Sequence, residues 1–186
     1  IEAISRQLND LYQEPDTKDC QELDELIEQQ KFDDAIKACL SLTETYPSSA
    51  VLNINLGKCY FELGQIEQAI SSYENAIEIN PKCVAAFVML SQIHSVQGDA
   101  DQAIKNLEKA INLEPNNHKL YSTIGVEYLQ KGDVEEAVNY LEKALKQNPN
   151  SQSVLSIIAN AYNKLGLVLY EKGKLDEAIA AYQKVL

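Results

Sequence analysis

Proline, glycine and alanine recur in this chain at one shared interval of 34 residues. The prolines are Pro47, Pro81, Pro115 and Pro149, the glycines are Gly64, Gly98, Gly132 and Gly166, and the alanines are Ala35, Ala69, Ala103 and Ala137. Three residue types that keep one register through four copies indicate an internal repeat. A repeat of this length is typical of a solenoid, in which each unit relies on its neighbours to cover its apolar face.

Each unit opens with apolar residues at helical spacing, in the order large, large, small, aromatic. One copy reads Ile54, Leu56, Gly57 and Tyr60, and a later copy reads Tyr121, Ile124, Gly125 and Tyr128. The small residue of the pattern stands where two helices approach closely. It is Gly57, Ser91, Gly125 or Ala159 in successive units. Gly64, Gly98 and Gly132 are predicted to end the first helices of their units, because glycine adopts a positive φ without strain.

A second helix is predicted to follow that glycine in each unit. Asp99 with Gln102, and Asp133 with Glu136, have the spacing of a capping box. Residues such as Ala103, Leu107 and Ala110 then share one helical face. The recurrent proline ends this helix, because it lacks an N–H and disfavours the α conformation in the preceding residue. Each unit is therefore predicted to be an antiparallel helical hairpin.

This pattern resembles the tetratricopeptide repeat (TPR) family, whose 34-residue unit runs aromatic, Leu-Gly, Tyr, Ala, aromatic, Pro. One unit of this chain matches it with Asn53, Leu56-Gly57, Tyr60, Ala69, Tyr73 and Pro81, and another with Tyr121, Ile124-Gly125, Tyr128, Ala137, Leu141 and Pro149. The resemblance covers about residues 16 to 186. It implies an all-α, right-handed superhelical solenoid of about five antiparallel helix hairpins.

The repeat register divides the chain into a single solenoid domain with atypical ends. We predict an N-terminal capping helix at 1–15, a degenerate first repeat at 16–49, regular repeats at 50–83, 84–117 and 118–151, and a fifth repeat at 152–186. The capping helix carries Ile1, Ile4, Leu8 and Leu11 and could also be the tail of an earlier repeat. In the first repeat Gln30 replaces the recurrent glycine.

The fifth repeat breaks the period, because the expected alanine moves from a spacing of 34 to 41 residues, from Ala137 to Ala178. Seven extra residues are about two helical turns, so the apolar face is nearly preserved. Two interpretations fit. Either one long helix runs from about 152 to 172 and a second helix starts at about 175, or two partial repeats are fused, with residues lost between them. We favour the long helix. The apolar face of Ile179, Tyr182 and Leu186 has no neighbour in the sequence, which suggests a fragment of something larger or a self-associating chain.

The overall charge excludes some classes of partner. The chain has 28 acidic and 16 basic residues, a formal net charge of −12. Such a surface repels phosphate backbones and anionic lipids, so we expect no nucleic acid partner. No stretch approaches the roughly 18 apolar residues that span a bilayer, so we expect no membrane insertion. No signal peptide is visible, and the four widely spaced cysteines favour reduced thiols, so a cytoplasmic location is expected.

We find no pattern that predicts catalysis or a bound cofactor. The cysteines lack the spacing of a zinc site, and the two histidines have no nucleophile motif beside them. His94 takes the aromatic position of the repeat, and His118 is expected to be solvated at a helix start. Phosphate-binding glycine motifs are missing from the sequence. The chain is therefore predicted not to be an enzyme and to need neither metal nor cofactor.

In repeats of the family that this chain resembles, the first helices form a concave groove that holds a partner. By register, we expect the groove residues to be Asn55, Lys58, Phe61, Glu62, Val88, Met89, Gln92, Val96, Thr123, Val126, Leu129, Gln130, Asn160, Asn163 and Lys164. Several of them are apolar, and exposed apolar patches usually mark an interaction site. The clamp that grips chaperone tails is poorly matched, since only Asn55 fits. A ladder of asparagines is poorly matched too, because the series runs Asn55, Met89, Thr123, Ile157.

The sequence thus favours a protein–protein interaction scaffold that binds a helical or extended peptide segment of a partner in this groove. One alternative is the targeting or substrate-recognition region of a larger enzyme, such as a bacterial glycosyltransferase or methyltransferase. The other is a homo-oligomeric assembly protein that associates through its C-terminal helix.

Overall fold

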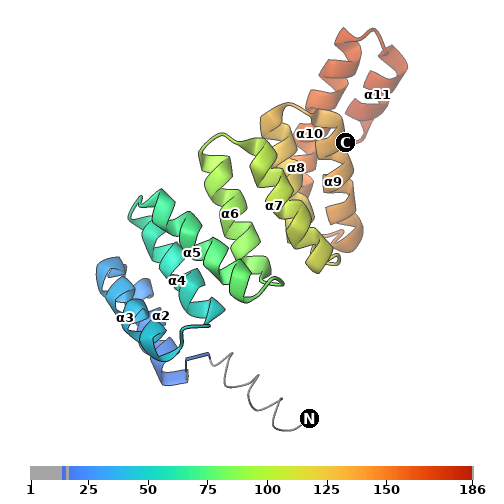
Figure 1. Cartoon of the computed structure of the whole chain (residues 1–186). Helices are drawn as coiled ribbons and strands as arrows, with labels where there is room; N and C mark the ends of the chain where they lie inside the picture. Colours follow the sequence, from blue (N-terminus) through green and yellow to red (C-terminus); the bar gives the residue numbers. More distant parts are fainter. Residues whose placement is uncertain (1–13, 16, 186) are drawn as a thin grey trace. The chain divides into compact units, whose positions relative to one another are not determined.

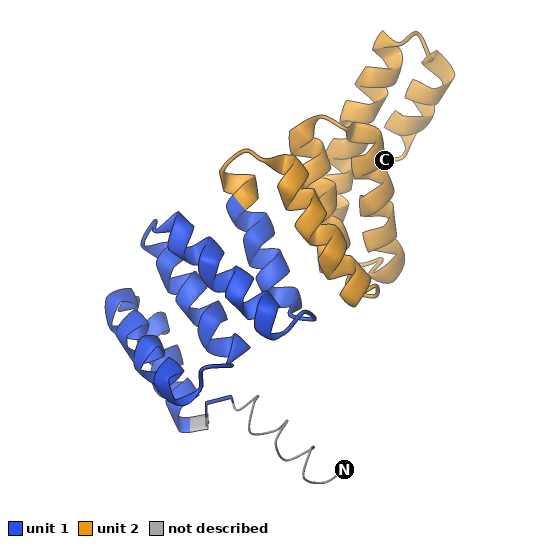
Figure 2. Ribbon diagram, in the orientation of Figure 1, with its two compact units in different colours: residues 1–93 blue, residues 94–186 orange. Residues whose placement is uncertain are grey.

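The fold is all α-helical over the part of the chain that the computed structural model describes, residues 14–15 and 17–185 (Figure 1). The predicted capping helix at 1–15 therefore lies almost wholly outside the described residues. The chain divides into two compact units, residues 1–93 and 94–186 (Figure 2). Unit 1 contains α2 (Thr17–Glu28), α3 (Phe32–Thr45), α4 (Ala50–Glu62), α5 (Ile66–Ile79) and most of α6 (Val84–Val96). Unit 2 contains the end of α6 and then α7 (Ala100–Leu113), α8 (His118–Lys131), α9 (Val134–Gln147), α10 (Gln152–Glu171) and α11 (Leu175–Gln183).

Within each unit, consecutive helices run antiparallel and are joined by short turns. The predicted turn glycines have the left-handed backbone that ends a first helix, with φ of 72° at Gly64, 78° at Gly98 and 92° at Gly132. The degenerate first repeat makes the same turn with Gln30, whose φ is 58°. That conformation costs a residue with a Cβ more than it costs glycine, so the α2–α3 turn carries local strain.

The two predicted capping boxes behave differently. Asp99 does cap α7, because its carboxylate accepts a hydrogen bond of 3.1 Å from the backbone N–H of Gln102. Asp133 makes no such bond at the start of α9, so the prediction is wrong there. Its carboxylate lies instead 3.2 Å from the ammonium of Lys131, which draws it away from the helix end.

The small residues of the repeat pattern lie at close helix contacts. A Cβ on Gly57 of α4 would come within 2.6 Å of the Tyr73 ring on α5, and one on Gly125 of α8 within 2.7 Å of the Leu141 side chain on α9. Tyr73 and Leu141 are themselves fully buried. These two hairpins therefore close by packing one large side chain of the second helix over a glycine of the first helix.

Among the described residues of unit 1, two clusters of buried side chains lie along the helices. One holds Leu23, Ile27, Ala35, Cys39, Leu52, Leu56 and Cys59, and the next holds Ala69, Tyr73, Ala76, Cys83, Ala86, Leu90 and Ile93. In unit 2, the cluster Val138, Leu141, Ala144, Val154, Ile158, Ala161 and Tyr162 joins α9 to α10. Each cluster mixes residues from neighbouring hairpins, as expected when a repeat cannot bury its apolar surface alone.

The break in period is resolved by the long α10. It is one continuous helix of 20 residues, as the favoured interpretation expected. Its first half packs on α9 through Val154 and Ile158, and its second half packs on α11 through Leu169. Gly166 lies inside the helix, where an added Cβ would come within 2.6 Å of the Tyr182 ring, and Gly173 makes the following turn with φ of 74°. The second half of α10 therefore follows the register displaced by seven residues.

Candidate peptide-binding surface

Unit 1 contains seven of the predicted groove residues, on α4 and α6. Lys58, Glu62 and Gln92 are exposed, whereas Asn55, Phe61, Val88 and Met89 are half-buried. The structure brings Phe61 and Met89 to one place, because both pack against the cluster that contains Tyr73. Part of their apolar surface is therefore used in joining neighbouring hairpins. The arrangement is a packed apolar base with charged and amide side chains standing beside it.

Unit 2 contains the other eight predicted groove residues, at the end of α6 and on α8 and α10. Six are exposed and two, Val126 and Leu129, are half-buried. The exposed ones are Val96, Thr123, Gln130, Asn160, Asn163 and Lys164. Leu129 packs against the α9–α10 cluster. Val96 is the most exposed large apolar side chain among the described residues, at 72%. It follows Ser95, whose hydroxyl lies 3.5 Å from the Gln130 side-chain oxygen, so the end of α6 lies next to α8 on this surface.

A hollow of about 350 Å³ lies beside this point, lined by Ser95, Asp99, Asp101, Gln130 and Lys131 among others. Lys131 pairs with Asp101 at 2.9 Å and with Asp133 at 3.2 Å. Hydrogen bonds to these two carboxylates raise the pKa of Lys131, so its charge is committed to them. The charged lining of the hollow thus consists of the Lys131–Asp101 ion pair and the carboxylate of Asp99, which caps α7.

A polar network that the sequence did not reveal joins α9, α10 and the C-terminal end of unit 2. The Tyr162 hydroxyl donates to Glu142, and the Lys184 ammonium donates to Glu142 at 2.9 Å and to Tyr162 at 3.2 Å. The hydrogen bond from Tyr162, followed by the one from Lys184, lowers the pKa of Glu142. The repeat pattern predicted Tyr162 as an aromatic packing residue, but nothing in it indicated the partners of its hydroxyl.

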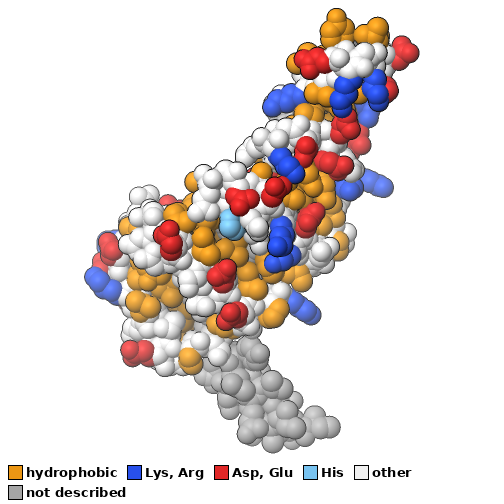
Figure 3. Space-filling model, turned by 45° about the horizontal axis from the view of Figure 1, so that its top comes forward, with side chains coloured by type: hydrophobic (Ala, Val, Ile, Leu, Met, Phe, Trp, Pro, Cys, Tyr) orange, Lys and Arg blue, Asp and Glu red, His pale blue; other side chains and the backbone are white. Residues whose placement is uncertain are grey.

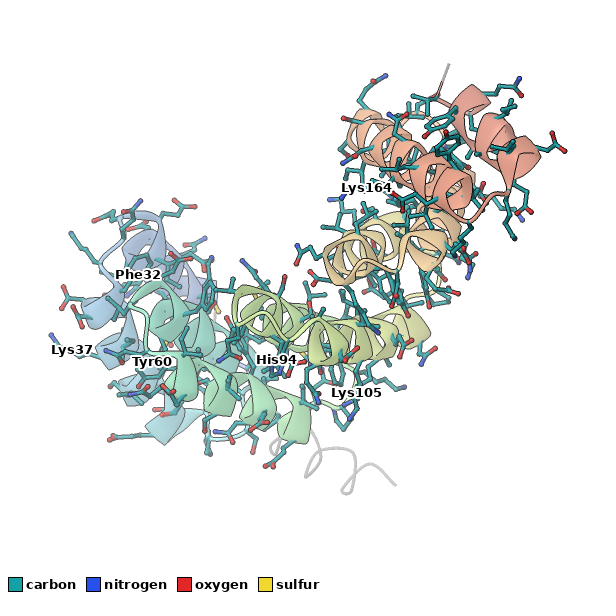
Figure 4. All side chains as sticks on the ribbon, turned by 90° about the horizontal axis from the view of Figure 1, so that it is seen from above. Phe32, Lys37, Tyr60, His94, Lys105 and Lys164 are labelled. Atoms are coloured by element: carbon teal, nitrogen blue, oxygen red, sulfur yellow. The ribbon has the colours of Figure 1, made fainter. Side chains whose placement is uncertain are left out.

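No grouping of side chains suited to a metal occurs in the described part of the chain. His118 is not simply solvated as expected, because it is half-buried and its Nε2 lies 3.2 Å from the Asn148 amide nitrogen. His94 is also half-buried; Figure 4 labels it on α6. On the face drawn in Figure 3, acidic side chains are interspersed with hydrophobic ones. Among the described residues, none of the helices is both long and apolar enough to cross a bilayer.

The repeats match two family profiles. Residues 41–155 match the cytochrome c-type biogenesis protein H TPR domain, and residues 159–186 match the tetratricopeptide repeat. The chain belongs to the tetratricopeptide repeat (TPR) family. The second match begins at residue 159, so Gly166 lies seven residues after its start. In a regular repeat, the small residue Gly57 likewise lies seven residues after the first residue, Ala50. Proteins of the TPR family are generally non-catalytic scaffolds. A search of curated proteins found no match.

Solved structures with the same fold cover nearly the whole chain. A crystal structure of MamA is 25% identical, with a TM-score of 0.70, and covers 91% of this chain and 89% of that one. YrrB, described as a TPR protein with an unusual peptide-binding site, is 18% identical, with a TM-score of 0.67 and coverage of 99% and 89%. The first TPR of Spaghetti (RPAP3), bound to an HSP90 peptide, is 21% identical, with a TM-score of 0.58 and coverage of 62% and 92%. These likenesses support the TPR fold.

Proposed function

We propose that this protein is a scaffold that binds a helical or extended peptide segment of another protein along the groove side of its first helices. The observation that carries the proposal is the pairing of half-buried apolar residues with exposed polar ones at the predicted positions. Phe61 and Met89 would supply apolar contact, while Lys58 and Gln92 would orient the peptide. Two of the structural neighbours are described by their peptide binding, which agrees with this use of the fold.

The exposed residues Lys58 and Gln92 are the best probes of this surface. Met89→Glu would be a poorer probe, because Met89 is half-buried and the change would place a charge against the Tyr73 cluster. The double change Lys58→Glu with Gln92→Arg reverses or adds charge without entering the core. We expect it to weaken peptide binding at least tenfold, measured by fluorescence polarisation with peptides selected against the wild-type protein.

Matched changes on the second helices serve as the control. Glu74→Lys with Lys105→Glu alters two exposed charges outside the predicted surface and should leave the affinity within about twofold. Circular dichroism would establish that all variants fold. If the groove variant binds every selected peptide as tightly as the wild type, the proposed surface is wrong.

A second candidate function, self-association, is favoured by one observation at the C-terminal helix. Leu175 and Ile179 of α11 are 55% and 56% exposed, whereas the equivalent Val134 and Val138 of α9 are 9% and 7% exposed. A copy of the chain could cover this face. Light scattering across a concentration series would test it, and a strictly monomeric chain would exclude it. The remaining alternative, a targeting or substrate-recognition region of a larger enzyme, would be tested by the length of the natural protein.

Two further parts of the proposal concern the boundaries and the compartment. We propose that the repeats run over 16–49, 50–83, 84–117, 118–151 and 152–186. Each helix pair, from α2–α3 to α10–α11, then forms one repeat. We also propose a reducing, cytoplasmic setting. The observation in its support is that the buried residues Cys39, Cys59 and Cys83 are free thiols.

A further inference from the structure

A hollow in unit 1 lies on the other side of α4 from the predicted groove. It has a volume of about 490 Å³ between a wall from α3 and a wall from α5, with α4 as its floor. Asn53 and Tyr60 of α4 line it. Asn53 and the groove residue Asn55 are two positions apart, about 200° round an α-helix, so the two surfaces do not overlap. Figure 4 labels Tyr60 on this hairpin.

At two positions beside the hollow, unit 1 has smaller residues than the repeat 68 residues later, while Tyr60 is a tyrosine in both. The equivalents of Asn53, Tyr60 and Ser72, 68 residues later, are Tyr121, Tyr128 and Tyr140. In unit 2 those three tyrosines fill the same place: the ring centroids of Tyr128 and Tyr140 are 5.3 Å apart, and those of Tyr121 and Tyr140 are 6.4 Å apart. Lys143, the equivalent of Asn75, lies with its ammonium 4.7 Å from the centroid of the Tyr140 ring and completes the cover.

The lining of the unit 1 hollow is polar yet uncharged, which is unusual in a chain with a net charge of −12. Gln68, Ser71 and Asn75 stand on the α5 wall at spacings of three and four, so they form a line along one face of that helix. All three side chains are exposed, so their donors and acceptors are accessible to a ligand. From 68 to 75 the line is about 10 Å long at 1.5 Å per residue, which matches about three residues of extended chain at 3.3 Å each.

The opposite wall supplies apolar contact. Leu40 of α3 is 47% exposed and lines the hollow together with Pro47. One wall thus offers donors and acceptors in a row, and the other offers an apolar surface. A row of amides suits a polymer whose N–H and C=O groups repeat regularly, and an apolar wall suits side chains that project to one side of it.

We propose that this hollow is a second binding site, for an uncharged extended peptide segment with apolar side chains. The main chain of the peptide lies along Gln68, Ser71 and Asn75, and one of its side chains packs against Leu40. The site is separate from the groove surface and is restricted to unit 1. In unit 2, Tyr121 and Tyr140 stand where unit 1 has Asn53 and Ser72, and both rings lie close to other tyrosine rings.

The chain itself provides the variant that closes the site. Asn53→Tyr with Ser72→Tyr copies the arrangement of Tyr121 and Tyr140 around Tyr60, so it should fill the hollow while keeping a packing that this fold already contains. Gln68→Ala with Asn75→Ala removes the amide row from an exposed helix face and leaves the hollow open. The second variant keeps the test decisive if the first does not fold.

The experiment is a selection from a phage-displayed library of seven-residue peptides on the wild-type protein, followed by affinity measurement on each variant. We expect a class of uncharged peptides that lose at least tenfold in affinity on both hollow variants and keep their affinity within twofold on Lys58→Glu with Gln92→Arg. The inference is overturned if no selected peptide responds to the hollow variants. It is also overturned if a glycan array yields a ligand whose binding these variants abolish, while no peptide shows such a loss. Peptides that respond only to the groove variant would support the proposed function and refute this one, so the two failures are distinguishable.

Discussion

Glycine serves two separate purposes in this chain, and each purpose has its own positions. Gly64, Gly98, Gly132 and Gly173 have positive φ and open space around the missing Cβ. Gly57, Gly125 and Gly166 are helical and lie against a large side chain of the following helix. A substitution at the first kind strains the backbone, whereas a substitution at the second kind overpacks a contact.

Gly125→Ala should destabilise the protein even though alanine is the better helix former. The helical preference is worth up to about 1 kcal/mol, but the added Cβ meets the branch point of Leu141 at 2.7 Å and the backbone oxygen of Ala137 at 3.3 Å, neither of which can move easily. Overpacking of a buried contact costs about 1–3 kcal/mol, so it outweighs the gain. Urea unfolding would measure the loss.

Gly166→Ala is the matched comparison. Its Cβ would meet the Tyr182 ring at 2.6 Å, but Tyr182 is 41% exposed and can turn aside. We expect a change close to zero there. A loss at Gly166 as large as at Gly125 would contradict this account of the contacts.

At the scale of the helix, the start of α7 and the start of α9 look alike in sequence and differ in structure. Asp99→Ala should cost about 1 kcal/mol, because it removes the hydrogen bond to the Gln102 N–H. Asp133→Ala should cost less, because it removes only an exposed ion pair with Lys131. Thermal unfolding of both variants would rank them, and equal losses would show that the cap of α7 contributes nothing.

The repeat period predicted most helices, their turns and their close contacts, because these depend on residues a fixed distance apart. The period did not predict which partner a polar side chain would bind when more than one lay within reach. Asp133 has the spacing of a cap and pairs with Lys131 instead, and His118 pairs with Asn148 across 30 residues. The groove residues followed from register alone, but their burial did not, since Phe61 and Met89 also pack between hairpins. The hollow beside Asn53 was missed, although the absence of an aromatic residue at that position was a visible signal.

At the scale of the whole molecule, buried ionisable groups make stability depend on alkaline pH. Burial raises the pKa of Cys39 from 9.0 to about 12, and burial also raises the pKa of Tyr73. The unfolded chain gives up the Cys39 proton near pH 9, whereas the folded chain keeps it. Stability is therefore intact below pH 9 and falls between pH 9 and 12, by up to about 1.4 kcal/mol per pH unit for this group.

Denaturant unfolding between pH 8 and 11 would measure this slope. The Cys39→Ala variant starts from a lower stability, because it loses buried volume, but its stability should fall less steeply with pH. An identical slope in both proteins would rule out Cys39 as the source. Cys20, which is half-buried, should react with thiol reagents before Cys39 does.

The long α10 has a consequence for protein engineering. Its first half accepts the helix that precedes it in one register, and its second half accepts the helix that follows in another, without a turn between them. Repeats from different solenoids can be joined only where each finds a neighbour that covers its apolar face. A two-turn extension such as that in α10 offers a ready-made adapter, so hairpins of different origin could be spliced across residues 159–166 while each keeps the neighbour that it was selected to contact.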